Sequence, residues 1–326
     1  MRIGKVSNED LKEIILSKLK KHSNDILIRP KIGEDCCAVD FGNYACVLSS
    51  DPITGAINEI GRLAVHITCN DVASCGVQPL AMLVTILAPP DTTKQDLKTV
   101  IKQLTETADS LHVEIIGGHT EITAAVNRMV ITSTAIGKIL KENLISTSGA
   151  KPGENIILTK SAGIEGTSIL AHDCEQVLLK VFKKDFVERA KSFINIISVV
   201  NEGIIAGEFG ASSMHDVTEG GILGAVWEVS EASGVGVKIY KDRIPVEPET
   251  AGITAYFGID PYKLISSGCM IITCKDGELL VHKLKMNGIP AAIIGETTEG
   301  TEKLFIGENT EDILQPDSDE LYKVIR

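Results

Sequence analysis

The segment EIGRLAVHITCNDVASCGVQP, which spans residues 59–79, decides how this sequence is interpreted. Its apolar residues recur at helical spacing and predict a helix over residues 59–75. The residues on that apolar face are Ile60, Leu63, Ala64 and Ile67. Asn70 and Asp71 fall inside this helix although both are poor helix formers, which makes Asp71 a candidate functional residue. The alternative is that Asp71 faces solvent or caps a break in the helix.

Around this segment, short apolar runs alternate with longer amphipathic runs, a pattern that predicts a mixed α/β fold. We expect further helices at 1–21, 92–111, 187–207, 222–232 and 278–286. We expect strands at 44–49, 82–87, 113–116, 129–137, 155–159, 235–239, 269–274 and 291–294. The turn-rich segment 146–153 is the best linker candidate, and a chain of 326 residues is long enough for two domains.

The charge balance excludes several classes of partner. The chain has 32 Lys and Arg residues against 44 Asp and Glu residues, and the net charge of −12 argues against nucleic acid and anionic membranes. Residues 1–21 lack the apolar core of a secretory signal. The longest apolar run, residues 79–90, is shorter than the ~20 residues that cross a membrane. We therefore expect a cytoplasmic protein.

The eight cysteines include no C-x-x-C pair, and most of them lie in apolar runs. We interpret them as reduced, small core residues that lack the ligand spacing of a zinc site. Cys36 and Cys37 directly follow an acidic residue, so a reactive thiol at that place is the open alternative.

Three short acidic motifs interrupt the apolar elements: Gly33-Glu34-Asp35, Ser50-Asp51-Pro52 and Asn70-Asp71. Carboxylates on separate segments suit a hard cation such as Mg²⁺, which takes oxygen ligands and also holds phosphate oxygens. Asp35, Asp51 and Asp71 would form such a site if the fold brings them together. The alternative for each residue taken singly is a helix cap or a turn.

Two glycine-rich motifs could approach a ligand with their backbone. Residues 115–121, IIGGHTE, predict a buried strand that runs into a Gly-Gly turn, whose N–H groups can face a phosphate. Residues 214–221, MHDVTEGG, lead into the helix expected at 222–232, with Asp216 or Thr218 as its N-cap. A glycine-rich turn at a helix N-terminus is also suited to anions. For both motifs, an ordinary turn is the alternative.

Common nucleotide and hydrolase signatures are absent from the sequence. No G-x-x-x-x-G-K-[ST] occurs, which excludes a P-loop. No G-x-G-x-x-G follows a first strand and no G-x-S-x-G occurs, which argues against a dinucleotide-binding Rossmann site and an α/β-hydrolase.

In their order and spacing, the motifs resemble those of the AIR synthase (PurM-like) superfamily, and most of all its HypE-type hydrogenase maturation branch. The matching segments are GEDCCAV (33–39), SDPIT (50–54), NDVASCGVQP (70–79), GGHT (117–120), KPGE (151–154) and HDVTEGG (215–221). The resemblance implies a two-domain PurM-like fold, with an N-terminal domain over residues 1–148 and a C-terminal α+β domain over residues 149–326. It also implies a homodimer in which the N-terminal mixed sheets of two copies join.

The resemblance further implies that ATP and Mg²⁺ bind in a cleft, where a phosphoryl group passes to an amide-type oxygen or another small-molecule or protein-borne acceptor. The implied metal ligands are Asp35, Asp51 and Asp71, and the implied catalytic residues are Asp71 and Asp216. The residues implied to contact the nucleotide are Gly33, Asn70, Gly117, Gly118, Thr120, Gly220 and Gly221.

Some features depart from the family pattern. Proteins of the HypE branch typically end in a cysteine that carries a thiocarboxamide, whereas this sequence ends at Ile325-Arg326. If the chain is complete, we expect that it cannot use its own C-terminus as acceptor. His119 stands where HypE and thiamine-monophosphate kinase have Asp. Selenophosphate synthetase has His there, but the absence of cysteine from residues 1–32 argues against that activity.

Three hypotheses follow. The first is a Mg²⁺-requiring, ATP-dependent enzyme of HypE-like type, acting in metallocofactor (hydrogenase) maturation on an acceptor that the sequence does not identify. The second is a small-molecule kinase that resembles thiamine-monophosphate kinase. The third is a nucleotide-binding partner in cofactor assembly without turnover.

Overall fold

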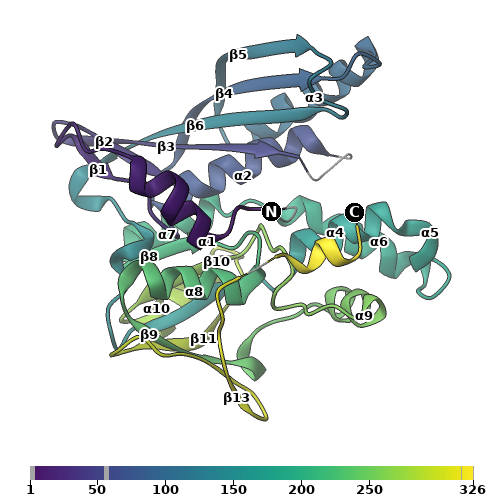
Figure 1. The fold of residues 1–326 in the computed structure, drawn as a ribbon. Helices are drawn as coiled ribbons and strands as arrows, with labels where there is room; N and C mark the ends of the chain where they lie inside the picture. The colour runs from purple at the N-terminus through teal and green to yellow at the C-terminus, as the bar shows by residue number, and fades with distance from the viewer. Residues whose placement is uncertain (1–3, 55–58, 317, 326) are drawn as a thin grey trace.

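The computed structural model describes residues 4–54, 59–316 and 318–325, and it contains two β-sheets that lie on either side of helix α2 (Ile60–Ser74) (Figure 1). The N-terminal sheet has six strands in the order β1-β2-β3-β6-β4-β5. These strands are β1 (Ile26–Ile28), β2 (Cys37–Phe41), β3 (Tyr44–Ile53), β6 (Val130–Leu140), β4 (Pro79–Ala88) and β5 (Glu114–Ile122). Neighbouring strands are antiparallel except β4 and β5, which are parallel.

One face of this sheet is packed against α2 and α3 (Lys94–Ser110). Alternate residues of β3, such as Ala45, Val47 and Ser49, are buried because successive side chains of a strand point to opposite faces. Helix α3 begins with a capping box in which the Thr93 and Asp96 side chains bond each other's backbone N–H groups.

The C-terminal sheet has seven strands in the order β13-β12-β9-β11-β7-β10-β8. These strands are β13 (Thr310–Asp312), β12 (Lys303–Ile306), β9 (Gly236–Tyr240), β11 (Ala291–Thr298), β7 (Asn155–Thr159), β10 (Met270–Cys274) and β8 (Ser213–Asp216). Ile156 and Leu158 of β7 pack with α8 (Gly221–Ser233) on one face. Ile157 packs with α7 (Val200–Phe209) and α10 (Gly277–Met286) on the other face, so the sheet is the middle of three layers.

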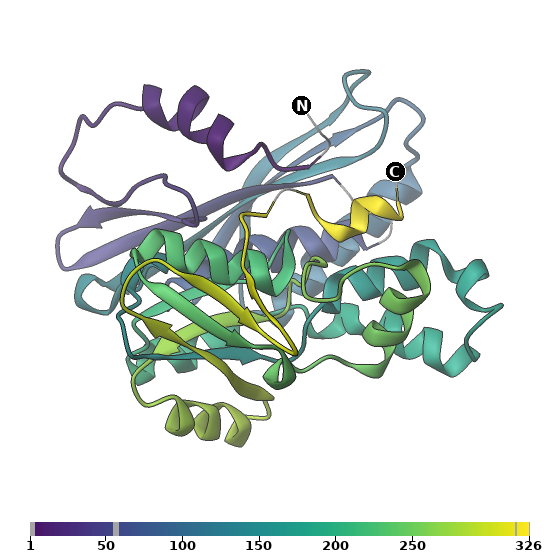
Figure 2. The ribbon, with the colours of Figure 1, turned by 60° about the horizontal axis from the view of Figure 1, so that its bottom comes forward.

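Further helices form a separate group beside the C-terminal sheet (Figure 2). They are α4 (Ile164–Asp173), α5 (Glu175–Leu178), α6 (Lys184–Ser192) and α9 (Pro248–Phe257). Near the start of the chain, α1 (Asn8–Asp10) continues as a π-turn (Leu11–Ile15) and a 3₁₀ turn (Leu16–Lys18). Other 3₁₀ turns occupy Lys141–Asn143, Thr147–Gly149, Phe193–Ile196, Lys241–Arg243 and Glu320–Lys323.

The expected mixed α/β architecture is confirmed, and every strand expected from the sequence is present, several of them longer. The expected helices at 59–75, 92–111, 222–232 and 278–286 are also confirmed. The helix expected at 1–21 is wrong in its extent, because among the described residues helical turns cover only Asn8–Lys18; residues 1–3 lie outside the described part. The expected domain boundary near residue 148 stays a prediction.

The single helix expected at 187–207 is also wrong, because the chain breaks between α6 and α7. The Asn70 side chain explains the break. Its Nδ2 donates to the carbonyl of Ile197 at 2.9 Å, and its Oδ1 accepts from the N–H of Val199 at 2.9 Å. The buried amide of α2 thus satisfies backbone groups that a continuous helix would pair internally.

No single helix in the described ranges is both long and apolar enough to span a membrane. The pair Lys184–Ile196 and Val200–Phe209 has that length and composition only when taken together, across a 51° bend. Its apolar residues, including Val187, Ala190 and Ala206, are buried in the hydrophobic cores.

Replacing Asn70 by Ala should lower the free energy of unfolding by about 2–4 kcal/mol, because one buried N–H and one buried carbonyl lose their partners. Urea denaturation of the variant and the wild type measures this difference. Asn143, exposed on a 3₁₀ turn, offers a matched control whose Ala variant should stay within about 0.5 kcal/mol of the wild type. Equal stability of Asn70→Ala and the wild type would contradict this role.

Candidate active site

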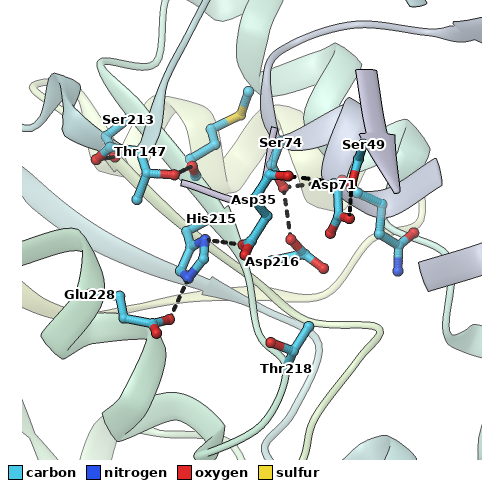
Figure 3. A network of polar contacts seen from close by, with 12 residues as sticks. Asp35, Ser49, Asp71, Ser74, Thr147, Ser213, His215, Asp216, Thr218 and Glu228 are labelled. Atoms are coloured by element: carbon cyan, nitrogen blue, oxygen red, sulfur yellow. Dashed lines mark hydrogen bonds and ion pairs between the residues drawn. The ribbon is translucent and has the colours of Figure 1, made fainter. Parts of the chain in front are cut away.

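Carboxylates from both halves of the chain meet between α2 and β8 (Figure 3). Asp51 lies on β3, Asp71 on α2 and Asp216 at the end of β8, while Asp35 precedes β2. Asp71 is 3% exposed and Asp216 is fully buried. A small hollow opens beside them, lined by Glu34, Asp35, Cys36, Asp71, Ser74, Cys75, Thr147 and His215.

Ser49 connects three of these carboxylate-bearing residues. Its hydroxyl lies 2.5 Å from Asp71 Oδ2, 3.3 Å from Asp51 Oδ2 and 3.4 Å from the backbone carbonyl of Asp35. Ser49 and Asp51 are two residues apart on β3, so their side chains leave the strand on the same face, toward α2. The hydroxyl therefore holds Asp71 against the sheet.

Ser74 connects α2 to the C-terminal sheet. Its hydroxyl lies 3.3 Å from Asp216 Oδ1 and also donates to the carbonyl of Asn70 at 3.1 Å. The second carboxylate oxygen, Asp216 Oδ2, is buried and has no hydrogen-bond partner among the described residues. A buried oxygen of this kind is costly unless a ligand satisfies it.

His215 sits between two carboxylates. Its Nδ1 lies 3.3 Å from Asp35 Oδ2, and its Nε2 lies 2.8 Å from Glu228 Oε2 on α8. Burial acts to lower the His215 pKa, but the Glu228 hydrogen bond and the charge of Asp35 outweigh it and raise the pKa to about 9. Near neutral pH both ring nitrogens are therefore protonated and donate. In this arrangement His215 connects Asp35 to Glu228, and its ring lies within 4.8 Å of ligand atoms of Asp35 and Asp216.

The acidic groups perturb one another. Burial and the neighbouring charges of Asp216 and Asp51 raise the pKa of Asp71 well above its ordinary value. Burial and the charge of Asp35 raise the pKa of Asp216 to about 6. Burial and like charges thus favour the protonated carboxyls, whereas a bound cation would favour their ionised form. The site offers carboxylate oxygens, which are the ligands that Mg²⁺ prefers. One of them, Asp216 Oδ2, has no partner among the described residues.

The glycines near α8 have mainly structural contacts. Gly33 turns with a φ of 75° against the backbone of Glu228, where a Cβ would lie 3.0 Å from the carbonyl oxygen. Gly220 is the N-cap of α8, so the N-cap expected at Asp216 or Thr218 is wrong. The N–H of Gly220 donates to Asp319 Oδ2 at 2.8 Å, and that of Gly221 donates to the carbonyl of Thr218 at 3.1 Å. The backbone N–H groups of Gly220 and Gly221, which were expected to face a phosphate, therefore already donate to groups within the protein.

The buried strand with a turn expected at Gly117-Gly118 is wrong on both points, because β5 is mostly exposed and runs straight through both glycines. Gly118 has a φ of 146°, and a Cβ there would lie inside contact distance of the paired Val84 backbone. The close pairing of β5 with β4 thus explains why position 118 is a glycine. Gly117, Gly118 and Thr120 lie on the edge strand, three strands from Asp51, which is about 14 Å at ~4.8 Å per strand. A single copy of the chain does not bring them to the carboxylates.

The thiols beside the site are not activated. A hydrogen bond with Cys75 and burial raise the pKa of Cys36 well above its ordinary value, and burial raises that of Cys37. Thiols with raised pKa values are poor nucleophiles, which disfavours the reactive cysteine left open by the sequence.

Sequence reasoning left several residues of the site unassigned: Ser49, Ser74, His215 and Glu228. Ser49 and Ser74 could have been found from their spacing, since Ser49 precedes Asp51 by two positions on a strand and Ser74 follows Asp71 by three on a helix. Glu228 carries no local signal, because its contact with His215 arises from the packing of α8 on β8.

Comparison with known proteins identifies the family. The family model described as AIR synthase related protein, N-terminal domain, matches residues 33–139, and the model of the corresponding C-terminal domain matches residues 151–307. A Methanocaldococcus jannaschii protein named for hydrogenase expression and formation is 30% identical over 312 residues, 93% of this chain and 91% of the relative. The chain belongs to the AIR synthase related family.

Other relatives carry more specific names. The carbamoyl dehydratase HypE of Cupriavidus necator is 28% identical over 78% of this chain and 68% of the relative. The thiamine-monophosphate kinase of Bacillus subtilis is 26% identical over 76% of each chain.

Solved structures agree on the fold. A chain of a HypE–HypF complex superposes with a TM-score of 0.78 at 23% identity, covering 94% of this chain and 99% of that chain. A HypE in complex with ATP superposes with a TM-score of 0.71 at 20% identity, covering 98% and 97%. The predicted family and the two-domain PurM-like fold class are therefore confirmed.

Replacing Asp216 by Asn should raise the free energy of unfolding at pH 7.5, without divalent cations, by up to about 3 kcal/mol. The folded-state pKa of about 6 lies roughly two units above that of an unfolded aspartate, and each unit corresponds to about 1.4 kcal/mol. The penalty on the charged form disappears as the pH falls from about 6 to about 4, so the two proteins should become equally stable there.

Chemical denaturation of both proteins at several pH values measures this difference. Asp242→Asn, at an exposed position, is the control and should change stability little at any pH. A destabilised Asp216→Asn variant at pH 7.5 would contradict the electrostatic account.

Proposed function

We propose that this chain is a Mg²⁺-dependent enzyme that transfers the γ-phosphoryl group of ATP to an oxygen of an amide-type acceptor. The observation that carries this proposal is the pair of buried carboxyls, Asp71 and Asp216, which come from the two halves of the chain. Asp216 Oδ2 has no partner among the described residues. Support comes from the relatives named carbamoyl dehydratase and from the similar fold of a HypE bound to ATP.

The side chains at this site would contribute metal binding and the orientation of the metal ligands. Asp35, Asp71 and Asp216 would hold Mg²⁺, with Asp51 close to Asp71 through Ser49. A bound Mg²⁺ would neutralise phosphate charge and orient the phosphates for in-line attack. Ser49 and Ser74 fix the orientation of Asp71 and Asp216, and the His215 imidazolium fixes Asp35. Catalysis would then rest on positioning and charge neutralisation.

With a carbamoyl acceptor, the amide oxygen would attack the γ-phosphorus and ADP would leave, while one N–H proton is lost. The oxygen would then depart as phosphate with loss of the second N–H proton, which leaves a carbon–nitrogen triple bond. With a phosphate monoester as acceptor, transfer alone would complete the reaction. The relative named thiamine-monophosphate kinase favours this second candidate.

Replacing Asp71 by Asn should reduce ATP turnover at least about 100-fold, because the substitution removes one metal carboxylate and keeps the volume and fold. ADP formation is measured with a panel of acceptors that includes a thiocarbamoylated cysteine peptide and thiamine monophosphate. Asp242→Asn should retain wild-type turnover.

The outcome of the panel distinguishes the hypotheses. ADP formed only with the thiocarbamoylated peptide supports the dehydratase, and phosphate transfer to thiamine monophosphate supports the kinase. ATP binding without turnover on any acceptor would instead support a nucleotide-binding partner in maturation. Turnover that survives Asp71→Asn unchanged would refute the assigned site.

We further propose that two copies associate through the N-terminal sheets. Strand β5 is an edge strand whose residues are mostly exposed, and such an edge is available for pairing or covering. Leu80 and Leu83 of β4 and Ile116 of β5 are 61%, 41% and 54% exposed. Exposed apolar side chains that cluster on a sheet indicate an interaction surface.

Replacing Leu83 and Ile116 together by Glu should convert a dimer to a monomer, because the charges would be buried in the interface. Light scattering coupled to size-exclusion chromatography measures the mass. The control is Leu279→Glu, at an exposed position on α10, which should leave the mass unchanged. A wild-type protein that is monomeric at micromolar concentration would refute the proposed dimer.

A further inference from the structure

Lys5 approaches the acidic site from a segment far away in sequence. Its backbone N–H donates to Glu219 Oε2 at 3.3 Å. The preceding Gly4 has a φ of 114° and packs beside the ring of Tyr322, where a Cβ would lie 3.3 Å from Cε2. The segment before α1 is therefore attached to the loop between β8 and α8.

Glu219 is itself held in place. The Tyr322 hydroxyl donates to Glu219 Oε1 at 2.9 Å, so one carboxylate oxygen binds Tyr322 and the other binds the Lys5 backbone. Burial and the charge of Glu219 raise the Tyr322 pKa, which keeps this hydroxyl protonated as a donor. The position of the Lys5 backbone thus depends on Glu219 and Tyr322, not on the contacts of its own side chain.

The Lys5 ammonium lies among the carboxylates without pairing closely with one of them. Its Nζ is 3.5 Å from Thr218 Oγ1, a residue that lies next to Asp216 in Figure 3. No carboxylate of a described residue lies within 4.0 Å of it. The attraction of nearby carboxylates raises the Lys5 pKa. These carboxylates are Asp35, Glu228, Glu219 and Asp51.

This placement suits a phosphate better than a simple counter-ion. An ammonium that only balanced the carboxylates would be expected in direct contact with one, as Lys160 is with Glu202 at 2.5 Å. Lys5 instead keeps its N–H donors available beside the carboxylates that would hold Mg²⁺. A nucleotide phosphate bound there needs cationic groups on more than one side, and a lysine ammonium is a common phosphate ligand.

We propose that Lys5 binds a phosphate of the nucleotide at this site, and that Glu219 and Tyr322 are the residues that position it. The proposal rests on the proposed function, because it assumes that the carboxylates hold Mg²⁺ and ATP. The alternative is that Lys5 occupies the cation position and competes with Mg²⁺. The two roles predict opposite effects of removing the charge on the binding of Mg²⁺ alone.

The test compares Lys5→Gln, Lys5→Arg and Lys18→Gln with the wild type by titration calorimetry. Lys18 is an exposed residue on the same N-terminal segment and serves as the matched control. Loss of one charge-assisted hydrogen bond should weaken Mg²⁺–ATP binding about 10- to 100-fold in Lys5→Gln. Lys5→Arg should retain most of the affinity, and adenosine, which has no phosphate, should bind all four proteins equally.

Tyr322→Phe tests the positioning role. It removes the hydroxyl that holds Glu219, so Mg²⁺–ATP binding should weaken several-fold while adenosine binding stays unchanged. Thermal unfolding of each variant checks that the fold is retained. A general loss of structure would weaken the binding of both ligands, whereas the proposed role affects only the ligand that carries phosphates.

Two results would overturn the role of Lys5. One is unchanged Mg²⁺–ATP affinity in Lys5→Gln while Asp71→Asn loses binding, which would leave the proposed function intact. The other is tighter binding of Mg²⁺ alone to Lys5→Gln, the result expected of a competing counter-ion. A wild-type protein that binds no Mg²⁺–ATP would refute the proposed function together with this inference.

Discussion

The structure depends on one costly arrangement, in which like-charged carboxylates are buried where α2 meets β8. Asp71 and Asp216 come from opposite halves of the chain and are joined through Ser49 and Ser74. Burial and neighbouring charges raise the pKa values of these two groups, and Asp216 Oδ2 has no partner in the described part of the chain. Such a site lowers the stability of the protein in the absence of a cation, and this cost is expected where binding and chemistry take place.

The surrounding structure holds this site in place. Asn70 precedes Asp71 and binds the backbone at the break before α7, so the same turn of α2 carries a structural amide and a candidate metal ligand. The His215 imidazolium joins Asp35 to Glu228 and links the N-terminal half to α8. Small displacements between the halves would therefore change the distances among the carboxylates directly.

Much of this site could be predicted from sequence. The Asn70-Asp71 pair violates helix preference in an otherwise apolar helix, and Asp71 does lie in the carboxylate group. Asp35 and Asp51 could be proposed because carboxylates on separate segments suit a hard cation, whereas Asp216 could be proposed only from the resemblance to the family. The alternation of short apolar runs with longer amphipathic runs predicted the α/β class correctly. The spacing of apolar residues determines which face of a helix or strand is buried.

The errors have physical causes. The break between α6 and α7 depends on an amide about 130 positions away in sequence, which no local pattern reports. Gly117 and Gly118 look like a turn locally, but pairing with β4 keeps them in a strand. Lys5 reaches the site through contacts of its segment with Glu219 and Tyr322, which lie more than 200 positions away in sequence. Local propensity describes the elements, whereas these contacts arise from tertiary packing.

The central claim is that the buried carboxylates form a cation-dependent ATP site. Calorimetric titration of the wild type with ATP at pH 7.5, with Mg²⁺ and then with a chelator, tests it most directly. The account predicts saturable one-site binding with Mg²⁺ and at least about 100-fold weaker binding without it, since the triphosphate would then meet uncompensated negative charge. Equal affinity under both conditions, or no binding with Mg²⁺, would contradict it.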